Sequence, residues 1–356
     1  MSDTSIIATA KRDYSLVGTE TKRAEERGLA SAAWYTCPIS RQRFKELMQR
    51  KNCPAIRDTL IWFALIITSG VLGCLTWGTW WAVPCFFVYG TLYASTSDSR
   101  WHESSHRTAF KTIWMNDALY EIASFMVFRE SVAWRWSHTR HHTDTIIVGR
   151  DPEIAVPRPP DIRGIILGFF TLKSTPLEFK KMLRHCVGNI SPAEATFIPE
   201  SERPKLIRNA RIYILIYAAV ITAAIVTRSF LPLMYIGLPQ FYGSWLMVTY
   251  GLTQHAGLAE DVLDHRLNCR TVYMNPVFRF LYWNMNYHVE HHMYPLVPYH
   301  ALPALHAELK ADMPPPYKSI PEAYREIIPA LLRQVKEPTF YVKRPLPTPA
   351  AIPQPA

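Results

Sequence analysis

The chain contains little cysteine, and none of it is arranged to hold a cofactor. Its six cysteines include no Cys-x-x-Cys pair, which fits reduced thiols and argues against a disulfide framework or a thiolate iron–sulfur site. A Gly-x-Gly-x-x-Gly word for a dinucleotide and a haem-attachment word are also missing. The sequence contains no basic groove motif with interleaved aromatic residues, so it gives no indication that nucleic acid is a partner. If the protein performs redox chemistry, we expect its electrons to come from a separate chain.

Charge is absent from one long stretch. Thr59 to Ser97 holds 39 residues without Asp, Glu, Lys or Arg. Because a membrane-crossing helix needs about 20 apolar residues, this stretch predicts two spans joined by a tight turn. A buried helix pair in a soluble protein is the alternative, but a charge-free run this long is rare in soluble folds. A second pair of apolar segments follows and predicts two more spans, and Pro239 is expected to kink the last of them. The four predicted spans are about 59–77, 79–97, 206–227 and 231–253.

Basic residues flank these spans unevenly. Lys and Arg are dense between residues 41 and 57, whereas the predicted outer turns carry only Arg228. The positive-inside rule therefore places the N-terminus in the cytoplasm, and four spans return the C-terminus to the same side. We attribute most of the net charge of +10 to this bias. The first 57 residues are polar, which is not the pattern of a cleavable signal.

The predicted fold class is an all-α integral membrane protein. Its four transmembrane helices form two hairpins, and a cytoplasmic helical cap carries the residues that follow each hairpin. Two segments, 113–128 and 162–184, are too polar or too short to span and are expected to be surface helices. The expected organisation is a polar, partly disordered tail over 1–40, a membrane domain over 41–335 and a proline-rich tail over 336–356.

Eight of the 13 histidines fall in three short sequence motifs beside the apolar segments, which we call the histidine words. The first is His102-Glu-Ser-Ser-His106, and the other two, His138-Thr-Arg-His141-His142 and His288-Val-Glu-His291-His292, share one spacing. On a helix, both spacings place the imidazoles on one face. Histidine suits first-row metals, and eight ligands are too many for one zinc ion but fit two irons. With four spans, all three words lie in the cytoplasm and are able to form one site.

Further histidines have weaker claims as ligands. His255 lies where the fourth span leaves the membrane, facing the same compartment as the three words, and is the ninth candidate ligand. His265 lies in an apparent loop between two charged residues and is a poorer candidate. The remaining histidines, His185, His300 and His306, are expected to be structural or solvated.

Two other functions remain open from the residues alone. Read by itself, the first word matches the His-Glu-x-x-His signature of a zinc hydrolase, with Glu103 as the base. That interpretation leaves the six other clustered histidines unexplained. A non-catalytic metal-binding or transport protein would carry its histidines within the spans, whereas these words lie outside them.

The combined pattern of His-x3-His and two His-x2-His-His words with two apolar hairpins resembles the membrane fatty acid desaturase family. The resemblance covers about residues 59–310. It implies a non-haem di-iron centre with histidine as the protein ligand, and the use of O2 to cleave an unactivated C–H bond. It implies no catalytic residue beyond the metal centre and no site for another cofactor. The implied ligands are His102, His106, His138, His141, His142, His255, His288, His291 and His292.

Neutral imidazoles leave the charge of two irons uncompensated, so nearby acids are expected to orient the rings. Arg150 is expected to form a local ion pair with the acids that follow it. Trp134 and Trp136 form either an aromatic interface belt or a wall of the substrate entrance. Gly251 stands where some family members carry an Asn. The candidate acids are Asp144, Asp151, Glu153, Asp261 and Glu290, and Asn284 and Asn286 are candidates for holding a water.

The resemblance favours a fatty acyl or lipid desaturase, with electrons from a ferredoxin or a cytochrome b5-like carrier. The alternative is a hydroxylase or oxidative demethylase, because desaturase-like proteins also act on alkyl chains and on small polar compounds such as rhizopines. The ligand set is the same in each case, and substrate placement decides the outcome. The expected partners are therefore this carrier, membrane lipid and a lipid-like or small-molecule substrate.

Overall fold

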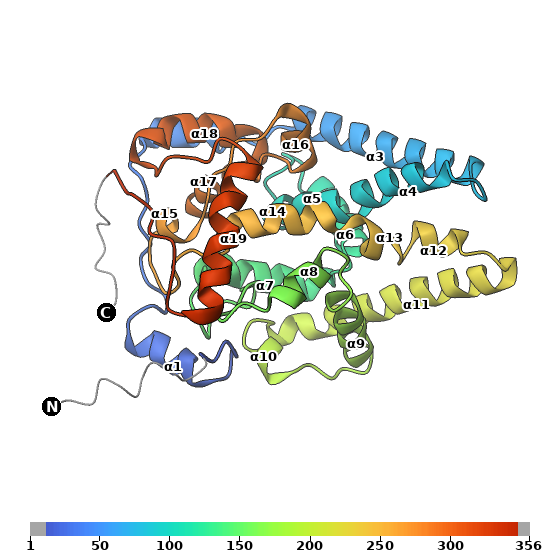
Figure 1. The fold of residues 1–356 in the computed structure, drawn as a ribbon, viewed down its shortest axis with the longest axis horizontal. Helices are drawn as coiled ribbons and strands as arrows, with labels where there is room; N and C mark the ends of the chain where they lie inside the picture. The colour runs from blue at the N-terminus through green and yellow to red at the C-terminus, as the bar shows by residue number, and fades with distance from the viewer. Residues whose placement is uncertain (1–11, 348–356) are drawn as a thin grey trace.

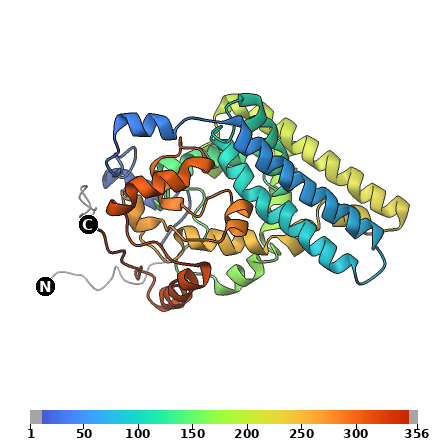
Figure 2. The same ribbon diagram turned by 90° about the horizontal axis from the view of Figure 1, so that it is seen from above.

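A computed structural model describes residues 12–347, which fold mainly as helices (Figure 1). No β-strand forms within this range; two isolated bridges join Thr271 to Tyr287 and Val272 to Tyr317. Four helices, α3, α4, α11 and α12, project to one side of the molecule in both views (Figures 1 and 2). Most of the remaining helices form a cap on the other side, which includes α1 near the beginning and α19 near the end of the described chain (Figure 1).

The first hairpin pairs α3 (Asn52–Leu75) with a helix that continues into the cap. This second helix runs without a break through α4 (Ala82–Gly90), a π-helical turn (Thr91–Ser95) and α5 (Thr96–Ser105). Gly78, at a positive φ of 86°, makes the turn between the two helices. The helix predicted to end at residue 97 therefore extends to the first histidine word.

The second hairpin is less regular than predicted. Its first helix, α11 (Arg203–Thr227), is continuous, but the predicted span 231–253 is divided into three helices. The uninterrupted span is thus corrected, because Gly237 adopts a positive φ of 101° and Gly243 packs directly against the backbone of Gly90. The break includes Pro239, where a kink was expected. The three helices are α12 (Leu231–Tyr235), α13 (Pro239–Gly243) and α14 (Trp245–His255).

Two helical stretches are long and apolar enough to cross a membrane, Arg41–Leu75 and Glu200–Thr227. Only 33% and 17% of the most apolar stretch in each is buried inside the protein, so most of these side chains face outward. The other two predicted spans do not form single apolar helices of that length. The first of them is a continuous helix that contains a π-helical turn and becomes polar toward α5, and the breaks around α13 divide the other.

The cap contains the surface helices expected from the sequence. The helix predicted at 113–128 is α6 (Ile113–Met126), and the one predicted at 162–184 is split at 169–173 into α8 (Ile162–Gly168) and α9 (Ser174–Cys186). The other helices of the cap are α7 (Ser131–Thr143), α10 (Pro192–Ala195), α15 (His265–Asn268), α16 (Pro276–Leu281), α17 (His288–Met293), α18 (Leu302–Leu309) and α19 (Ile320–Lys336).

Residues 12–40 belong to the segment predicted as a partly disordered tail, yet they pack against the cap. Helix α1 (Thr19–Glu26) buries Ala24, which joins Leu29 in a small core with Ile147 and Leu263. The segment continues to α2 (Arg41–Leu47). Residues 1–11 of the predicted tail, and 348–356 of the C-terminal one, lie outside the described residues.

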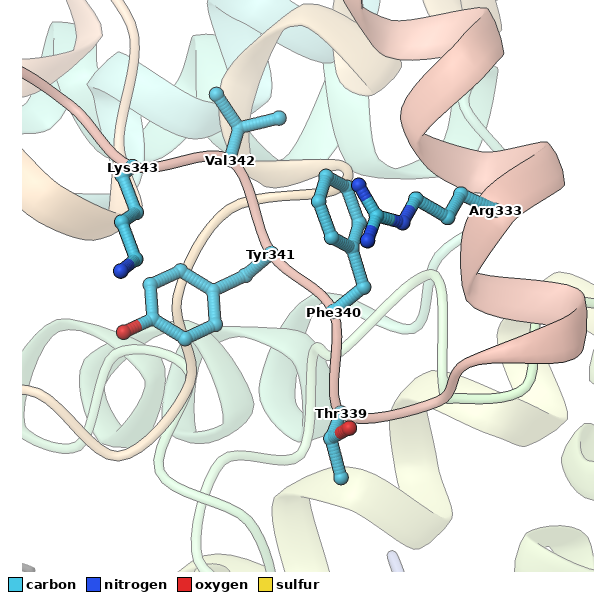
Figure 3. A pocket seen from close by; sticks show the side chains of 6 residues that line it. All are labelled: Arg333, Thr339, Phe340, Tyr341, Val342 and Lys343. Atoms are coloured by element: carbon cyan, nitrogen blue, oxygen red, sulfur yellow. The ribbon is translucent and has the colours of Figure 1, made fainter.

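The described part of the C-terminal tail is irregular and folds back on α19. Phe340 stacks under Arg333 at 4.1 Å, and the backbone N–H of Val342 donates to the carbonyl of Gly257 at 2.9 Å. These residues border a shallow surface hollow shown in Figure 3. None of its six lining residues belongs to a histidine word, so this hollow is separate from the candidate ligands.

Candidate metal centre

Four helices carry the nine candidate ligands. His102 lies in α5, and His106 is the residue that ends that helix. The second word occupies the last turns of α7, and the third word forms most of the short helix α17. His255 is the last residue of α14. The expected helical spacing is therefore present at each word, and the ends of these helices meet inside the cap.

Five imidazoles form a first cluster in which ligand atoms lie within 4.8 Å of one another. The Nε2 atoms of His102 and His291 are 2.7 Å apart, and Nε2 of His138 lies 3.2 Å from that of His106 and 3.2 Å from that of His142. The cluster thus combines all three words in one place. Its members are His102, His106, His138, His142 and His291.

Four imidazoles form a second cluster beside the first. Nε2 of His288 lies 3.0 Å from Nε2 of His255 and 3.0 Å from Nε2 of His292, and His141 packs against both His255 and His292. The two clusters touch where the rings of His142 and His292 stack at 4.4 Å. All nine predicted ligands therefore converge, including His255.

The spacing of the Nε2 atoms fits first-row metal ions. With metal–nitrogen bonds of about 2.1 Å, two ligands at a right angle place their nitrogens about 3.0 Å apart. The observed separations of 2.7–3.2 Å are close to that edge length. Two unprotonated nitrogens facing each other at this distance repel, whereas a cation between them is attracted to both.

The Nδ1 atoms show which nitrogen faces inward in four of the rings. Nδ1–H of His255 donates to the backbone carbonyl of Asn268 at 2.8 Å, an oxygen that can only accept. Nδ1 of His141 lies 2.8 Å from Asp151, and Nδ1 of His138 lies 3.1 Å from Glu153. These partners place the proton on Nδ1 and the lone pair on Nε2, as metal-bound histidines require.

The fourth ring is held by a hydroxyl. Thr145 donates its hydroxyl hydrogen to the carbonyl of His141 at 2.7 Å and so accepts from Nδ1–H of His292 at 3.2 Å. Neither Thr145 nor Asn268 was predicted. The Nδ1 atoms of His142, His288 and His291 are buried without a hydrogen-bond partner among residues 12–347.

Two of the five predicted acids, Asp151 and Glu153, contact ligands and supply negative charge. Burial by itself would raise the pKa of Glu153, but the positive charge of His138 in its protonated form and the hydrogen bond between the two side chains outweigh it and hold that pKa at about 2. Burial likewise lowers the pKa of His141, and the Asp151 carboxylate reverses this and raises it. Asp151 is fixed in turn by the backbone N–H groups of Ile146 and Glu153, at 2.7 and 2.8 Å.

The other three predicted acids do not contact the clusters. Asp144 pairs with Arg140 and Arg150, and Glu290 binds Thr271 and His306. Asp261 accepts from the backbone of Val148 and pairs with arginines of the N-terminal segment. Their expected role is therefore corrected: they hold the cap together. The sequence pattern did not reveal which way each carboxylate points.

The expected ion pair of Arg150 with the acids that follow it is also corrected. Arg150 pairs with Asp144 and Glu25, because the two acids that follow it turn toward histidines. The amide N–H groups of Asn284 and Asn286 donate to the backbone carbonyls of Tyr299 and Val272, whereas Oδ1 of Asn286 is buried without a partner among residues 12–347. That these side chains hold a water stays a prediction.

Glu103 does not face the metal clusters. Its Oε1 accepts from the hydroxyl of Thr108 at 2.7 Å and from the backbone N–H of Tyr299 at 3.0 Å. The side chain is fully buried, and burial raises its pKa to about 7. A carboxyl group held in this way is not placed to activate a metal-bound water, so the geometry argues against the zinc hydrolase.

A third group of possible ligands lies behind the second cluster. His265, Cys269 and His292 have ligand atoms within 4.8 Å of one another. However, the ring of His265 stacks on Trp34 at 4.2 Å, and Nε2 of His292 lies 3.0 Å from that of His288 in the second cluster. We therefore interpret His265 and Cys269 as packing behind His292.

Of the three remaining histidines that we expected to be structural or solvated, two are held by carboxylates and one lies apart from the clusters. His185 is fully buried between Glu130 and Glu194, and His306 contacts Glu290 and the hydroxyl of Tyr273. His300 stands apart from the clusters beside Tyr299. None of the three has a ligand atom in either cluster.

A cavity of about 820 Å³ opens next to both clusters. Five of the candidate ligands line it: His102, His138, His141, His255 and His288. Trp134 also lines it, which supports the interpretation of this residue as a wall of the entrance. Gly251 lines it as well, and no atom lies within 4 Å of where its Cβ would be.

The cavity wall is partly polar. Arg129 lies between the rings of Trp101 and Trp134, 4.2 and 4.5 Å from their centres, and pairs with Asp98. Gln254 and Glu260 add polar groups further along. No local pattern in the sequence marks these residues, because Asp98 of α5 and Arg129, between α6 and α7, meet only when these segments pack together.

The fold and the site define a helical protein with two adjacent histidine clusters of metal-binding geometry, next to a substrate-sized cavity. A family model, fatty acid desaturase, matches residues 39–323, more than half of the chain. The protein therefore belongs to the fatty acid desaturase family and is a desaturase-type oxidoreductase, as the histidine words predicted. None of the curated proteins compared with the chain matches it.

Proposed function

We propose that this protein is an O2-dependent di-iron enzyme that desaturates a fatty acyl or other lipid chain. One observation carries the proposal: nine imidazoles from four helices form two clusters with Nε2 separations of 2.7–3.2 Å, open to one cavity. Histidine ligands without bridging carboxylates suit a pair of irons whose charge is balanced from outside by Asp151 and Glu153.

We also propose four membrane passes, with both chain ends and the metal centre on the cytoplasmic side. The outward-facing side chains of α3 and α11 support this, as Leu75 is 77% exposed and Val226 76% exposed. Three tryptophans at the turn after α3 are exposed, as interfacial anchors would be. In this arrangement, α4 and the broken segment α12–α14 complete the two hairpins.

Bound irons would supply the activation of O2 and the removal of hydrogen from carbon. His102, His106, His138, His142 and His291 would hold one ion, and His141, His255, His288 and His292 the other. Asp151, Glu153, Thr145 and Asn268 keep the proton of four rings on Nδ1. Trp101 and Trp134 exclude water from the cavity and position the chain to be oxidised beside the histidines.

A second candidate is hydroxylation or oxidative demethylation of a smaller, more polar compound. The polar wall of the cavity favours it, because the Asp98–Arg129 pair and Gln254 offer hydrogen bonds that an alkyl chain does not use. Both candidates need the same irons, and both take electrons from a separate ferredoxin or cytochrome b5-like carrier.

Metal analysis and product analysis test the proposal together. Purified protein should contain about two irons per chain, and cells that express it should accumulate a lipid lighter by two hydrogens. A product heavier by one oxygen atom would select the second candidate. One zinc per chain and no O2 consumption would overturn both.

A further inference from the structure

The guanidinium of Arg129 lies in the cavity wall close to the first cluster. It is held between two aromatic rings, 4.2 Å from the centre of Trp101 and 4.5 Å from that of Trp134. The ring centre of Trp101 lies in turn 5.1 Å from that of His138. A single ring therefore separates this positive charge from a proposed iron ligand, and the two tryptophans fix the plane of the guanidinium.

One edge of this guanidinium has no partner within the described part of the chain. Nη1 of Arg129 donates to Asp98. Nε and Nη2 donate to no atom of residues 12–347, and neither atom is completely buried. These two nitrogens form the side of an arginine that binds both oxygens of a carboxylate. Since Arg129 lines the cavity, this edge is accessible to a molecule bound there.

The nearby acids leave this edge available. Glu153 also lines the cavity, but one of its oxygens accepts from the hydroxyl of Ser137 at 2.8 Å, and the other lies 3.1 Å from Nδ1 of His138. Asp98 therefore takes one nitrogen of Arg129 and Glu153 takes none.

The two other cations that line the cavity are less suited to an anion. Arg158 pairs with Glu260 at 3.2 Å and is 9% exposed. Lys173 is 66% exposed and lies 3.5 Å from Asp161. Arg129 combines a fixed orientation, two free nitrogens and closeness to the histidines, so it is the cavity cation best placed to hold an anion beside the metal centre.

Much of the remaining wall suits a hydrocarbon chain. Apolar side chains from α8, α9 and α14 line it: Ile165, Leu177, Val248 and Leu252. An acid with its carboxylate on Arg129 would place its apolar part against these side chains. The C–H bonds nearest the histidines would then be those close to the carboxylate.

We propose that Arg129 is a specificity-determining residue that binds the carboxylate of a free carboxylic acid, and that oxidation falls on carbons close to this carboxylate. This rests on the proposed function, because the irons perform the oxidation. Desaturation takes two hydrogens from neighbouring carbons; with O2, two electrons from the carrier and two protons, it yields an alkene and two waters. Hydroxylation with the same reactants yields an alcohol and one water. An ester or thioester lacks the negative charge that Arg129 recognises.

Binding of three small probes tests the site in the full-length, iron-loaded protein in nanodiscs. Calorimetry compares hexanoate with neutral hexanamide and cationic hexylammonium, and nanodiscs without protein correct for partition into lipid. Hexanoate should bind about tenfold more tightly than hexanamide, as expected for a charge-assisted pair. Arg129→Gln should remove this preference. Arg129→Lys should recover part of it, because the charge remains but the planar fork is lost.

Two further variants separate binding from a structural role. Asp98→Asn breaks the same ion pair but keeps the guanidinium, so it should bind hexanoate at least as tightly as the unchanged protein. Lys173→Gln removes another cavity cation and should stay within about twofold. Equal losses in Asp98→Asn and Arg129→Gln would overturn the proposal, because the pair would then only hold the wall in shape. Unchanged hexanoate binding in Arg129→Gln, or tighter binding of hexylammonium, would overturn it as well.

Product and metal analysis complete the test. Among the free acids of cells that express the protein, mass spectrometry should find the new double bond or hydroxyl next to the carboxylate end. A change in mid-chain would overturn the proposed position of attack. Protein that prefers hexanoate through Arg129 but holds one zinc and consumes no O2 would overturn the proposed function and leave the carboxylate site in place. Two irons without a preference that depends on Arg129 would do the reverse.

Discussion

At the scale of single residues, the distinction between His255 and His265 decides the ligand set. Both are histidines outside the three words, but only His255 brings Nε2 within 3.0 Å of another ligand, whereas His265 stacks on Trp34. His255→Ala should lose about one of the two irons and nearly all activity. His265→Ala should keep both irons. Iron analysis of the purified variants checks this, and the opposite result would exchange their roles.

Asp151 offers a second test at this scale, because it supplies charge as well as a hydrogen bond. Asp151→Asn preserves the shape of the side chain but removes the negative charge beside His141, so iron affinity should fall about 10–100-fold. Asp144→Asn is the matched control, since Asp144 is equally buried but pairs with arginines. Competition with a chelator measures both. Equal losses in the two variants would mean that the acids matter only for folding.

The residues that the sequence identified and those it missed differ in how they come together. The words at 102–106, 138–142 and 288–292 are each local, so helical geometry alone places their imidazoles on one face. Thr145, Asn268, Asp98 and Arg129 belong to the site because distant segments pack together. Their residue types are common on any surface, and no spacing distinguishes them.

At the scale of elements, the break between α13 and α14 aims His255 into the site. A Cβ on Gly243 would lie 2.1 Å from the carbonyl oxygen of Gly90, so α13 and α4 touch through their backbones there. Ser95, in the π-helical turn, accepts from the N–H of Met247 at 2.9 Å and fixes the start of α14. The sequence predicted one span kinked at Pro239 and not three helices, because the contact that sets the second break joins residues about 150 positions apart.

Gly243→Ala should therefore destabilise the protein by about 1–3 kcal/mol, the usual cost of overpacking, and reduce iron binding at the second cluster. Gly251→Ala is the matched control on α14, because a Cβ there meets no atom within 4 Å. Thermal unfolding in detergent, together with iron content, measures both effects. If the first variant unfolds no earlier than the second, backbone contact does not set the position of α14.

The junction of α7 and α9 predicts a dependence on pH. His185 is fully buried, with Nδ1 2.7 Å from Glu130, at the start of α7, and Nε2 3.1 Å from Glu194. Burial lowers its pKa, but the two carboxylates outweigh this and raise it to about 9. The folded pKa exceeds the unfolded value of about 6.5, so this stabilisation is complete below pH 6.5 and is lost as the pH rises toward 9.

Unfolding temperatures between pH 6 and 9.5 test this junction. The unchanged protein should lose on the order of 2 kcal/mol across that range from this group. His185→Gln should be less stable at pH 6 and should show a flatter profile. A profile as steep as that of the unchanged protein would assign the pH dependence to other groups.

At the scale of the whole molecule, the metal centre depends on the number of passes. The second predicted span leads into the first histidine word, and the fourth ends at His255. The two ends meet in one cap only if an even number of passes separates them. Sequence reasoning predicted an even number of passes from apolar length and from the basic residues that flank the spans. In the structure, one of the four predicted spans contains a π-helical turn and another is divided into three helices.

Native and introduced cysteines can test this topology, because Cys53 is exposed at the cap end of α3. In a background with no other cysteine, Cys53 and Lys336→Cys should react with a membrane-impermeant maleimide from the cytoplasmic side only. Thr79→Cys and Thr227→Cys, at the ends of the two hairpins, should react only from the opposite side. Each labelled protein should retain its iron, which shows that the site remained assembled. Labelling of Thr79→Cys and Thr227→Cys from opposite sides would contradict two hairpins, because the helices leading to His102 and to His255 would then end in different compartments and the two clusters could not form.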